Sequence, residues 1–246
     1  MTTIAENLQA VRTRIEAAAQ AAGRDPAGVR LLAVSKTWPA DCVQVAAMAD
    51  QRMFGESYVQ EAVSKIGECA ESDERGASLE WHFIGPLQSN KTRLVATHFH
   101  WVHAVDRERI ARRLSEQREE HLPPLNVCLQ VNVSGEASKS GVAPEELPAL
   151  ADAVAQLPRL RLRGLMCIPE PTPDVALQRA RFARLRELSE ALQARGHALD
   201  TLSMGMSDDL EAAILEGSTL VRVGSAIFGA RDSAPAADNT LPPETR

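Results

Sequence analysis

The segment Val29-Arg30-Leu31-Leu32-Ala33-Val34-Ser35-Lys36 is the part of this sequence from which the fold prediction is built. Five of its eight residues are valine, leucine or alanine, a pattern typical of a strand that is covered on both faces. Pro39 follows at a position that the first turn of a helix accepts. The segment therefore predicts a strand, a short loop and a helix, with Lys36 at the carboxyl end of the strand. In α/β folds, binding and catalytic residues lie at such strand ends.

Lysine is rare in this chain, which makes Lys36 a candidate functional residue. Of the 27 basic residues only four are lysines, so arginine supplies most of the positive charge. A lysine is better suited than an arginine where a compact amine must lose its proton and attack a carbonyl. The alternative interpretation of Lys36 is a solvated charge at the end of a strand. The four lysines are Lys36, Lys65, Lys91 and Lys139.

Composition places the chain among ordinary globular proteins. It has 246 residues, of which 44% are hydrophobic and 24% are charged. No run is long enough to span a membrane and residues 1–16 are too polar for a signal peptide, so we expect a cytoplasmic protein. A net charge of −6 argues against a nucleic-acid binder. The four cysteines form no CxxC pair, so we expect neither a metal site nor a disulfide framework.

Hydrophobic periodicity predicts eight strands that alternate with helices. The expected strands are 29–36, 52–57, 79–85, 100–105, 125–133, 160–168, 199–206 and 220–229. The expected helices are 3–22, 40–50, 59–69, 87–97, one that Asp106 caps and that runs to about 120, 144–156, 175–195 and 208–216.

This alternation predicts a single (β/α)8 TIM barrel over residues 1–231, with an extra N-terminal helix before the first strand. The proline-containing tail 232–246 is expected to be disordered. An open, doubly wound sheet is the alternative. It is less favoured because no GxGxxG motif follows the first strand and because eight strands suit barrel closure.

Unusual residues gather at the predicted strand ends, which in a barrel would surround one pocket. They are Lys36, Ser57, Tyr58, His82, Asn132, Lys139 in the loop after the fifth strand, Pro169, the run 203–209 and the run 221–225. Ser207, Gly224 and Ser225 are of the kind that barrels use to bind a phosphate after strands seven and eight. A plain helix cap is the alternative role for Ser207.

Arg222 and Gly224 are two residues apart, so both point to the same side of the eighth strand. An arginine that points into a barrel needs an acceptor, because an unpaired buried charge is costly. An amine, a phosphate site and an inward arginine together suggest a ligand with an aldehyde at one end, a phosphate at the other and an acceptor between them. Pyridoxal phosphate fits this description.

Several long motifs closely resemble the pyridoxal phosphate homeostasis proteins (YggS/PROSC type). The motifs are 32–36, 54–56, 58–61, 82–91, 203–209 and 221–231, and the resemblance extends from about residue 4 to 231. It implies a barrel like the N-terminal domain of alanine racemase, with Lys36 in a Schiff base to pyridoxal phosphate. It also implies phosphate contacts from Ser207, Gly224 and Ser225, and Arg222 facing the pyridine nitrogen.

The resemblance carries three further expectations about the site. His82 and Ser203, which lie within the shared motifs, join the candidate cofactor-binding residues. Lys139 matches a loop lysine that would make a secondary or transient contact. Ser57 stands where the family usually has asparagine, so a cofactor contact there is shortened or lost.

Two functions from different classes follow. The first is a monomeric protein that stores, buffers or delivers pyridoxal phosphate to apo-enzymes without turnover of its own. The second is an amino-acid racemase or a related enzyme. Arg222 favours the first because it can only donate to the pyridine nitrogen and so weakens the ring as an electron sink. We also expect no second domain to cover the site, and only one tyrosine, Tyr58, to serve as a second base. A Schiff-base aldolase is a third, weaker alternative.

Overall fold

Eight parallel strands close into a barrel in sequence order, from β1 beside β2 to β8 beside β1. The structure is a computed structural model that describes residues 2–72, 78–135 and 140–230. The strands are β1 Arg30–Val34, β2 Met53–Glu56, β3 Glu80–Phe83, β4 Trp101–Val105, β5 Leu125–Gln130, β6 Leu160–Met166, β7 Thr201–Ser203 and β8 Leu220–Val223. The closed sheet confirms the predicted barrel and rules out the open doubly wound alternative.

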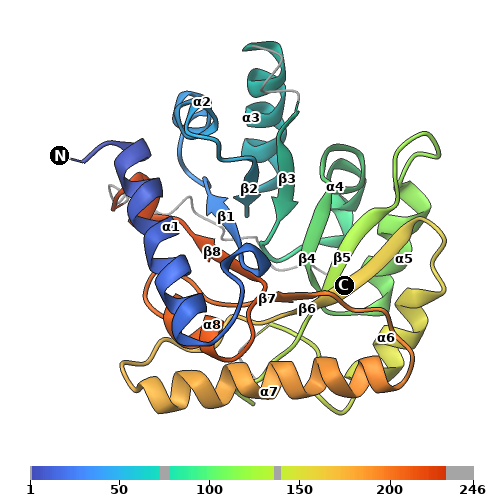
Figure 1. The fold of residues 1–246 in the computed structure, drawn as a ribbon. Coiled ribbons are helices and arrows are strands. Elements are labelled where there is room, and N and C mark those ends of the chain that lie inside the picture. Colours follow the sequence, from blue (N-terminus) through green and yellow to red (C-terminus); the bar gives the residue numbers. More distant parts are fainter. Residues whose placement is uncertain (1, 73–77, 136–139, 231–246) are drawn as a thin grey trace, which may run out of the picture.

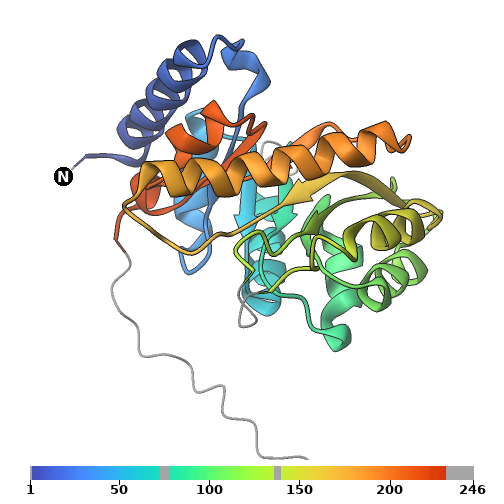
Figure 2. The same cartoon turned by 90° about the horizontal axis from the view of Figure 1, so that it is seen from below.

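Helices surround the barrel, and Figures 1 and 2 show the long helix α7 lying along one side of it. They are α1 Ile4–Ala21, α2 Ala40–Met48, α3 Val59–Ser72, α4 Thr92–His98, α5 Glu108–Gln117, α6 Leu147–Ala155, α7 Val175–Ala194, α8 Leu210–Leu215 and α9 Ser225–Phe228, with 3-10 turns η1 Pro26–Gly28 and η3 Ser89–Lys91. The extra N-terminal helix α1 packs against α8 and α9. The Asn7 side-chain amide donates to the carbonyl of Ile227 over 2.8 Å, which ties this helix to the end of the barrel.

Two local predictions were wrong. The eighth strand ends at Val223, because Gly224 accepts hydrogen bonds from Ile227 and Phe228 and the chain turns into α9. The Asp106 side chain does not cap α5, whose N-cap is Arg107. Asp106 instead pairs with the Arg107 guanidinium.

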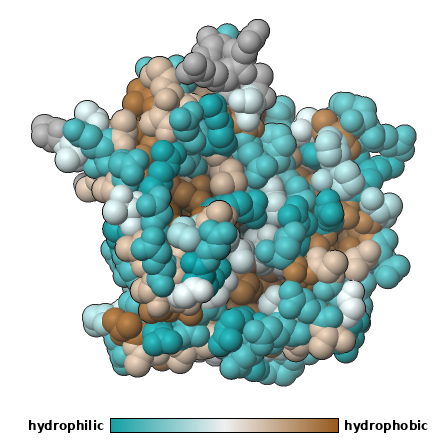
Figure 3. All heavy atoms as spheres, viewed as in Figure 1, coloured by the Kyte–Doolittle hydropathy of each residue, from teal (hydrophilic) through white to brown (hydrophobic). Residues whose placement is uncertain are grey.

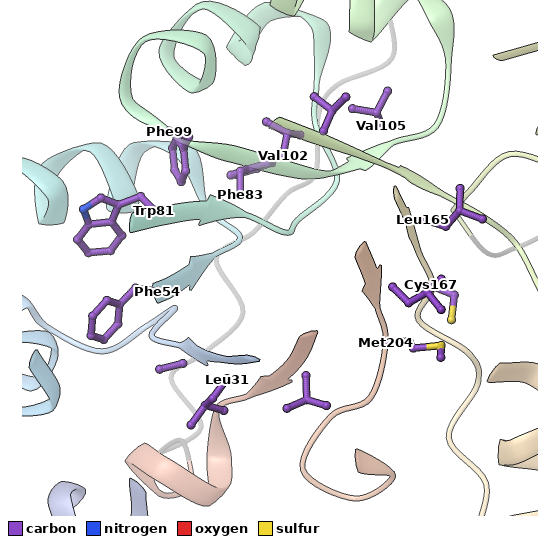
Figure 4. Packing of buried hydrophobic residues seen from close by; sticks show 14 of the residues in the cluster. Leu31, Phe54, Trp81, Phe83, Phe99, Val102, Val105, Leu165, Cys167 and Met204 are labelled. Atoms are coloured by element: carbon purple, nitrogen blue, oxygen red, sulfur yellow. The ribbon is translucent and has the colours of Figure 1, made fainter. Parts of the chain in front are cut away.

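The outer faces of the strands form the main hydrophobic core with the helices. Figure 4 shows Trp81, Phe83 and Phe99 close together beside β3 and β4, and the rings of Phe83 and Phe99 meet edge to face with their centroids 5.5 Å apart. Phe54 packs against Trp81 at 5.7 Å. These aromatic side chains belong to one cluster with the buried faces of the helices.

The inner faces are different, because side chains of a strand alternate between its two sides. Leu32, Val34, Ile84 and Leu220 form a separate apolar cluster, and Trp101, Ala104, Cys128 and Met166 form another. Between these two clusters the barrel interior holds charged and polar residues, all of them buried: His82, His103, Ser203 and Arg222. The interior of the barrel is therefore partly polar and is not filled by apolar side chains alone.

The surface is of mixed character. Figure 3 shows apolar side chains in small areas among polar ones on the face that is seen in Figure 1. Within the part of the chain that the structure describes, no helix has the length and apolar character needed to cross a membrane. The predicted disordered tail 232–246 and Lys139 lie outside the described residues.

Candidate functional site

Lys36 lies in a turn just beyond β1. The strand itself ends at Val34, so Lys36 follows it by two residues rather than ending it, and its side chain is partly buried. The next residue, Thr37, has a φ of 70°, a conformation that a β-branched residue rarely adopts. The backbone on both sides of Lys36 is therefore held in a specific shape.

Gly224 lies against the strand that leads to Lys36. A Cβ atom on Gly224 would come within 3.1 Å of the Val34 carbonyl oxygen and 3.3 Å of the Val34 Cβ. A larger residue here would force β1 and β8 apart or fill the space between them. The close approach brings the Lys36 turn and the start of α9 to the same end of the barrel.

Two serines meet beside Gly224, as the sequence predicted. The Ser225 hydroxyl donates to the Ser207 hydroxyl over 3.2 Å. Arg14 of α1 donates to the Ser207 carbonyl over 3.0 Å, and the Met206 N–H donates to the Asp209 carboxylate over 2.6 Å. These bonds fix the loop that carries Ser207. The N-cap of α8 is Asp209, so the alternative of Ser207 as a plain helix cap is wrong.

Arg222 is buried below this serine pair, with an exposed fraction of 3%. One guanidinium nitrogen, Nη1, donates to the carbonyl and to the hydroxyl of Ser203, the latter over 2.8 Å. The other, Nη2, donates to the carbonyl of Cys167 over 2.8 Å. Burial lowers the pKa of Arg222 from its ordinary value, but a guanidinium stays charged at neutral pH. These three bonds use three of its five N–H groups.

A chain of hydrogen bonds runs from Arg222 through the barrel to the start of β3. The Ser203 hydroxyl lies 2.8 Å from Nδ1 of His103, whose Nε2 lies 2.9 Å from Nδ1 of His82. The Nε2 atom of His82 lies 2.7 Å from the carboxylate of Glu80, which is 39% exposed. We call Arg222, Ser203, His103, His82 and Glu80 the interior polar chain.

The Glu80 end of the interior polar chain sets the direction of donation. The Glu80 carboxylate accepts from Nε2 of His82, so neutral His82 has an unprotonated Nδ1, which accepts from Nε2 of His103. Neutral His103 then accepts on Nδ1 from the Ser203 hydroxyl, whose oxygen also accepts from Arg222. Burial lowers the pKa of His82 and places that of His103 well below 6.5, so both rings are neutral. The hydrogen bond from His82 holds the pKa of Glu80 below its usual value.

The sequence-predicted residues thus fall into two groups. Lys36, Ser207, Arg222, Gly224 and Ser225 are brought to the same end of the barrel by the contacts above. His82 and Ser203 lie deeper, in the interior polar chain, where each of them lies within hydrogen-bond distance of His103.

Ser57 follows β2 and is half-buried. A Cβ atom on Gly85 would come within 2.5 Å of the Ser57 carbonyl, so the ends of β2 and β3 are in close contact there. Tyr58 is 53% exposed, and its carbonyl accepts from Ala62 in the first turn of α3. Both residues therefore lie at the rim of the strand ends.

A small cavity of about 170 Å³ opens at the ends of β3, β5 and β6. Ile84, Pro86 and Ile168 supply its apolar wall, and Gln130 and Ser140 supply its polar groups. The Gln130 amide donates to the Ser140 carbonyl over 3.2 Å. This wall offers amide and hydroxyl groups, and none of the described residues that line it is charged.

The donor set fits pyridoxal phosphate. Lys36 offers a primary amine, which suits an aldehyde; Ser207 and Ser225 offer two hydroxyls, which suit a phosphate; and Arg222 offers a guanidinium, which suits a ring nitrogen. The absence of a side chain on Gly224 permits its close approach to Val34. Hydroxyl and backbone N–H groups at a helix start suit phosphate oxygens.

Sequence reasoning missed three residues that support the site. His103 links Ser203 to His82. Its alternation with Trp101 in β4 is the signal that could have placed it inside the barrel. Lys65 and Glu56 lie buried behind the Lys36 turn. The scarcity of lysine was a signal for Lys65, but only the fold shows what it contacts.

Comparison with known sequences gives a consistent result. The sequence profile of the alanine racemase N-terminal domain family matches residues 7–232. A Pseudomonas aeruginosa protein named pyridoxal phosphate homeostasis protein is 68% identical over 237 residues, which cover 96% of this chain and 100% of that protein. The Escherichia coli K12 protein of the same name is 57% identical over 235 residues, covering 94% of this chain and 98% of that one. Both are named for homeostasis and not for a reaction.

Solved structures give the same fold. PipY of Synechococcus elongatus, solved with PLP bound, is 38% identical with a TM-score of 0.80 and covers 92% of this chain and 100% of its own. The alanine racemase of Corynebacterium glutamicum is 18% identical with a TM-score of 0.64 over 96% of this chain and 62% of that one. The second comparison concerns the barrel alone.

Proposed function

This chain belongs to the alanine racemase N-terminal domain family and, within it, to the pyridoxal phosphate homeostasis proteins, and from this premise we propose that it binds pyridoxal 5′-phosphate and holds it for storage, buffering or delivery. Lys36 is the residue that bonds the cofactor as a Schiff base. The observation that carries the proposal is the contact of Gly224 with Val34, which joins the Lys36 turn to the serine pair.

Each group of the site has a defined role in this proposal. The Lys36 amine forms a C=N bond with the aldehyde carbon and one water molecule leaves, so no oxidant or reductant is needed. Ser207 and Ser225 donate to phosphate oxygens, and Arg222 donates to the ring nitrogen. Lys139, whose placement lies outside the described residues, is a candidate for a second contact from the loop after β5.

A holding function suits this site better than turnover. When bound, the cofactor supplies an electron sink, and that sink is strongest when its ring nitrogen is protonated. Arg222 can only donate, and Ser203 and Cys167 fix its position, so the ring nitrogen stays unprotonated. Tyr58, the single tyrosine, is more than half exposed and not enclosed as a second base would be.

The mouth of the barrel also favours a holding function over turnover. Among the described residues, those that line the cavity at β3, β5 and β6 include no cation to bind the carboxylate of an amino acid. We therefore propose that the partners are apo-enzymes that receive the cofactor, and that the protein acts as a monomer. A racemase is the competing assignment.

The test compares delivery with catalysis. The protein loaded with pyridoxal phosphate is mixed with an apo-transaminase, and the appearance of transaminase activity is followed. In parallel, the loaded protein is incubated with L-alanine in deuterated water, and deuterium at the α-carbon is measured. We expect transfer without exchange at enzyme rates. Exchange on the order of 1 per second that Lys36→Ala abolishes would show that the protein is an enzyme.

A further inference from the structure

Lys65 of α3 is buried beneath the Lys36 turn, with an exposed fraction of 3% (Figure 1 shows α3 beside β2). Its ammonium donates to the Ser35 carbonyl over 2.8 Å, to Oε1 of Glu56 over 2.6 Å and to Oε1 of Glu61 over 2.8 Å. An ammonium has three N–H groups, and each of them meets one acceptor here. In a chain that otherwise prefers arginine, this site requires the more compact cation.

The contacts of Lys65 reach the turn from both sides of Lys36. On the preceding side, the Ser35 carbonyl accepts from Lys65, and the Ser35 hydroxyl donates to Glu56 over 2.8 Å. On the following side, the Thr37 N–H donates to Oε1 of Glu61 over 2.7 Å, and that same oxygen accepts from Lys65. One buried cation therefore joins the two peptide groups that flank Lys36.

This arrangement stabilises an unfavourable backbone conformation. Thr37 has a φ of 70°, a conformation that is unfavourable for a residue with a Cβ and persists only where its surroundings hold it. The charge-assisted bond to Glu61 is the contact that holds the Thr37 N–H, and Glu61 is in turn fixed by Lys65. Without these bonds the turn would relax, and the direction in which the Lys36 side chain leaves the backbone would change.

We propose that Lys65 and Glu61 are positioning residues that set the backbone of the Lys36 turn for reaction with the cofactor's aldehyde. This inference rests on the proposed function. Neither residue reacts itself. Their effect is on the rate at which bound cofactor is captured, whereas its noncovalent binding depends on the serine pair and on Arg222.

Glu61 offers the sharper test because its side chain is 33% exposed, while removal of Lys65 leaves a buried carboxylate uncompensated. The variants are Glu61→Ala, which removes the acceptor for Thr37, and Glu61→Gln, which keeps an oxygen there. Glu68→Ala, at an exposed position of the same helix, is the matched control. Lys65→Gln, which keeps two N–H groups, tests the role of the Lys65 ammonium directly.

Three measurements separate positioning from a merely structural role. Hydrogen exchange of the Thr37 amide in the cofactor-free protein should be faster in Glu61→Ala and near the original rate in Glu61→Gln. The limiting rate of covalent capture at saturating pyridoxal phosphate should fall about 10- to 100-fold in Glu61→Ala and in Lys65→Gln. Affinity for pyridoxine 5′-phosphate, which has an alcohol in place of the aldehyde, should stay as in the original protein.

The outcomes distinguish this inference from the proposed function. If the original protein forms no adduct on Lys36, the proposed function fails. If it does, and Glu61→Ala captures the cofactor equally fast with an equally protected Thr37 amide, only the positioning role is overturned. Equal losses of capture rate and of pyridoxine 5′-phosphate affinity would also overturn it, because they would indicate general loss of structure.

Discussion

The Nη1 atom of Arg222 lies 2.8 Å from the hydroxyl oxygen of Ser203, deep inside the barrel. Ser203 is completely buried, and its own proton goes to His103, so it holds the guanidinium rather than any ligand. β7 and the segment after β6 therefore determine the orientation of the Arg222 guanidinium.

Ser203→Ala should weaken cofactor binding although Ser203 itself makes no contact at the phosphate. The change removes one acceptor from a buried charge, which costs about 1–3 kcal/mol in unfolding free energy, and it frees the guanidinium to shift. Denaturant unfolding and equilibrium titration with pyridoxal phosphate measure the two effects. Ser218→Ala is the matched control, because its buried hydroxyl bonds only to backbone carbonyls of Leu202, Met204 and Leu220. Loss of stability without loss of affinity in Ser203→Ala would contradict the role of Ser203 in positioning Arg222 for the cofactor.

His82 and His103 should each carry a single proton on Nε2. This follows from the direction of donation along the interior polar chain, which the Glu80 carboxylate fixes because it can only accept. Nitrogen-15 NMR of the imidazoles distinguishes the two tautomers and the charged form. A proton on Nδ1 of either ring at neutral pH would show that the chain runs the other way.

The same two histidines should make the protein less stable in acid. Their pKa values in the folded state lie below the ordinary 6.5, because burial disfavours the charged ring. Below about pH 6.5 the unfolded chain therefore binds protons that the folded chain does not, and the unfolding free energy falls by up to about 1.4 kcal/mol per pH unit for each histidine. Above that pH they contribute no slope. Urea unfolding between about pH 7.5 and about pH 5.5 measures this.

His103→Gln should lessen the slope, and His121→Gln, at a side chain that is 72% exposed, is the control for loss of a histidine. A stability that does not change across this range would mean that both buried rings accept a proton in the folded protein.

The barrel could be predicted because its strands are recognisable from local runs of apolar residues. The run from Val29 to Val34 is apolar on both faces and gives β1 directly. β8 was predicted too long because the segment 224–229 is also largely apolar, whereas in the structure the Gly224 carbonyl accepts from Ile227 and Phe228 and the chain turns into α9. Local apolar pattern does not distinguish a strand from a short buried helix.

Candidate site residues could be proposed from the sequence where they lie at or near the carboxyl ends of predicted strands. Lys36, Ser207 and Arg222 were proposed in this way. Lys65 and His103 were not, because their roles depend on contacts between elements that are distant in sequence. Lys65 lies 30 residues from Ser35, and His103 lies 100 residues from Ser203. Such pairs become visible only after the barrel has closed.

Ser207→Ala combined with Ser225→Ala should weaken binding of pyridoxal phosphate more than binding of unphosphorylated pyridoxal. Each hydroxyl supplies one hydrogen bond to a charged group, worth roughly 1.5–3 kcal/mol. Titration with both ligands gives the difference, and the original protein supplies the reference. Equal losses for the two ligands would show that the serine pair, whose hydroxyls lie 3.2 Å apart, has a structural role only.

The central claim is that Lys36 holds pyridoxal phosphate covalently, and mapping of the attachment point tests it most directly. The purified protein is loaded with the cofactor and reduced with borohydride, then digested, and the modified peptide is identified by mass spectrometry. Lys36→Ala is treated in parallel; it should fold normally, because loss of a partly buried amine in a turn leaves no core cavity. The account predicts a reduced adduct on Lys36 that is lost in the variant together with the visible absorption. An adduct found only on Lys139 or another lysine, or absorption that survives in Lys36→Ala with the adduct elsewhere, would contradict it.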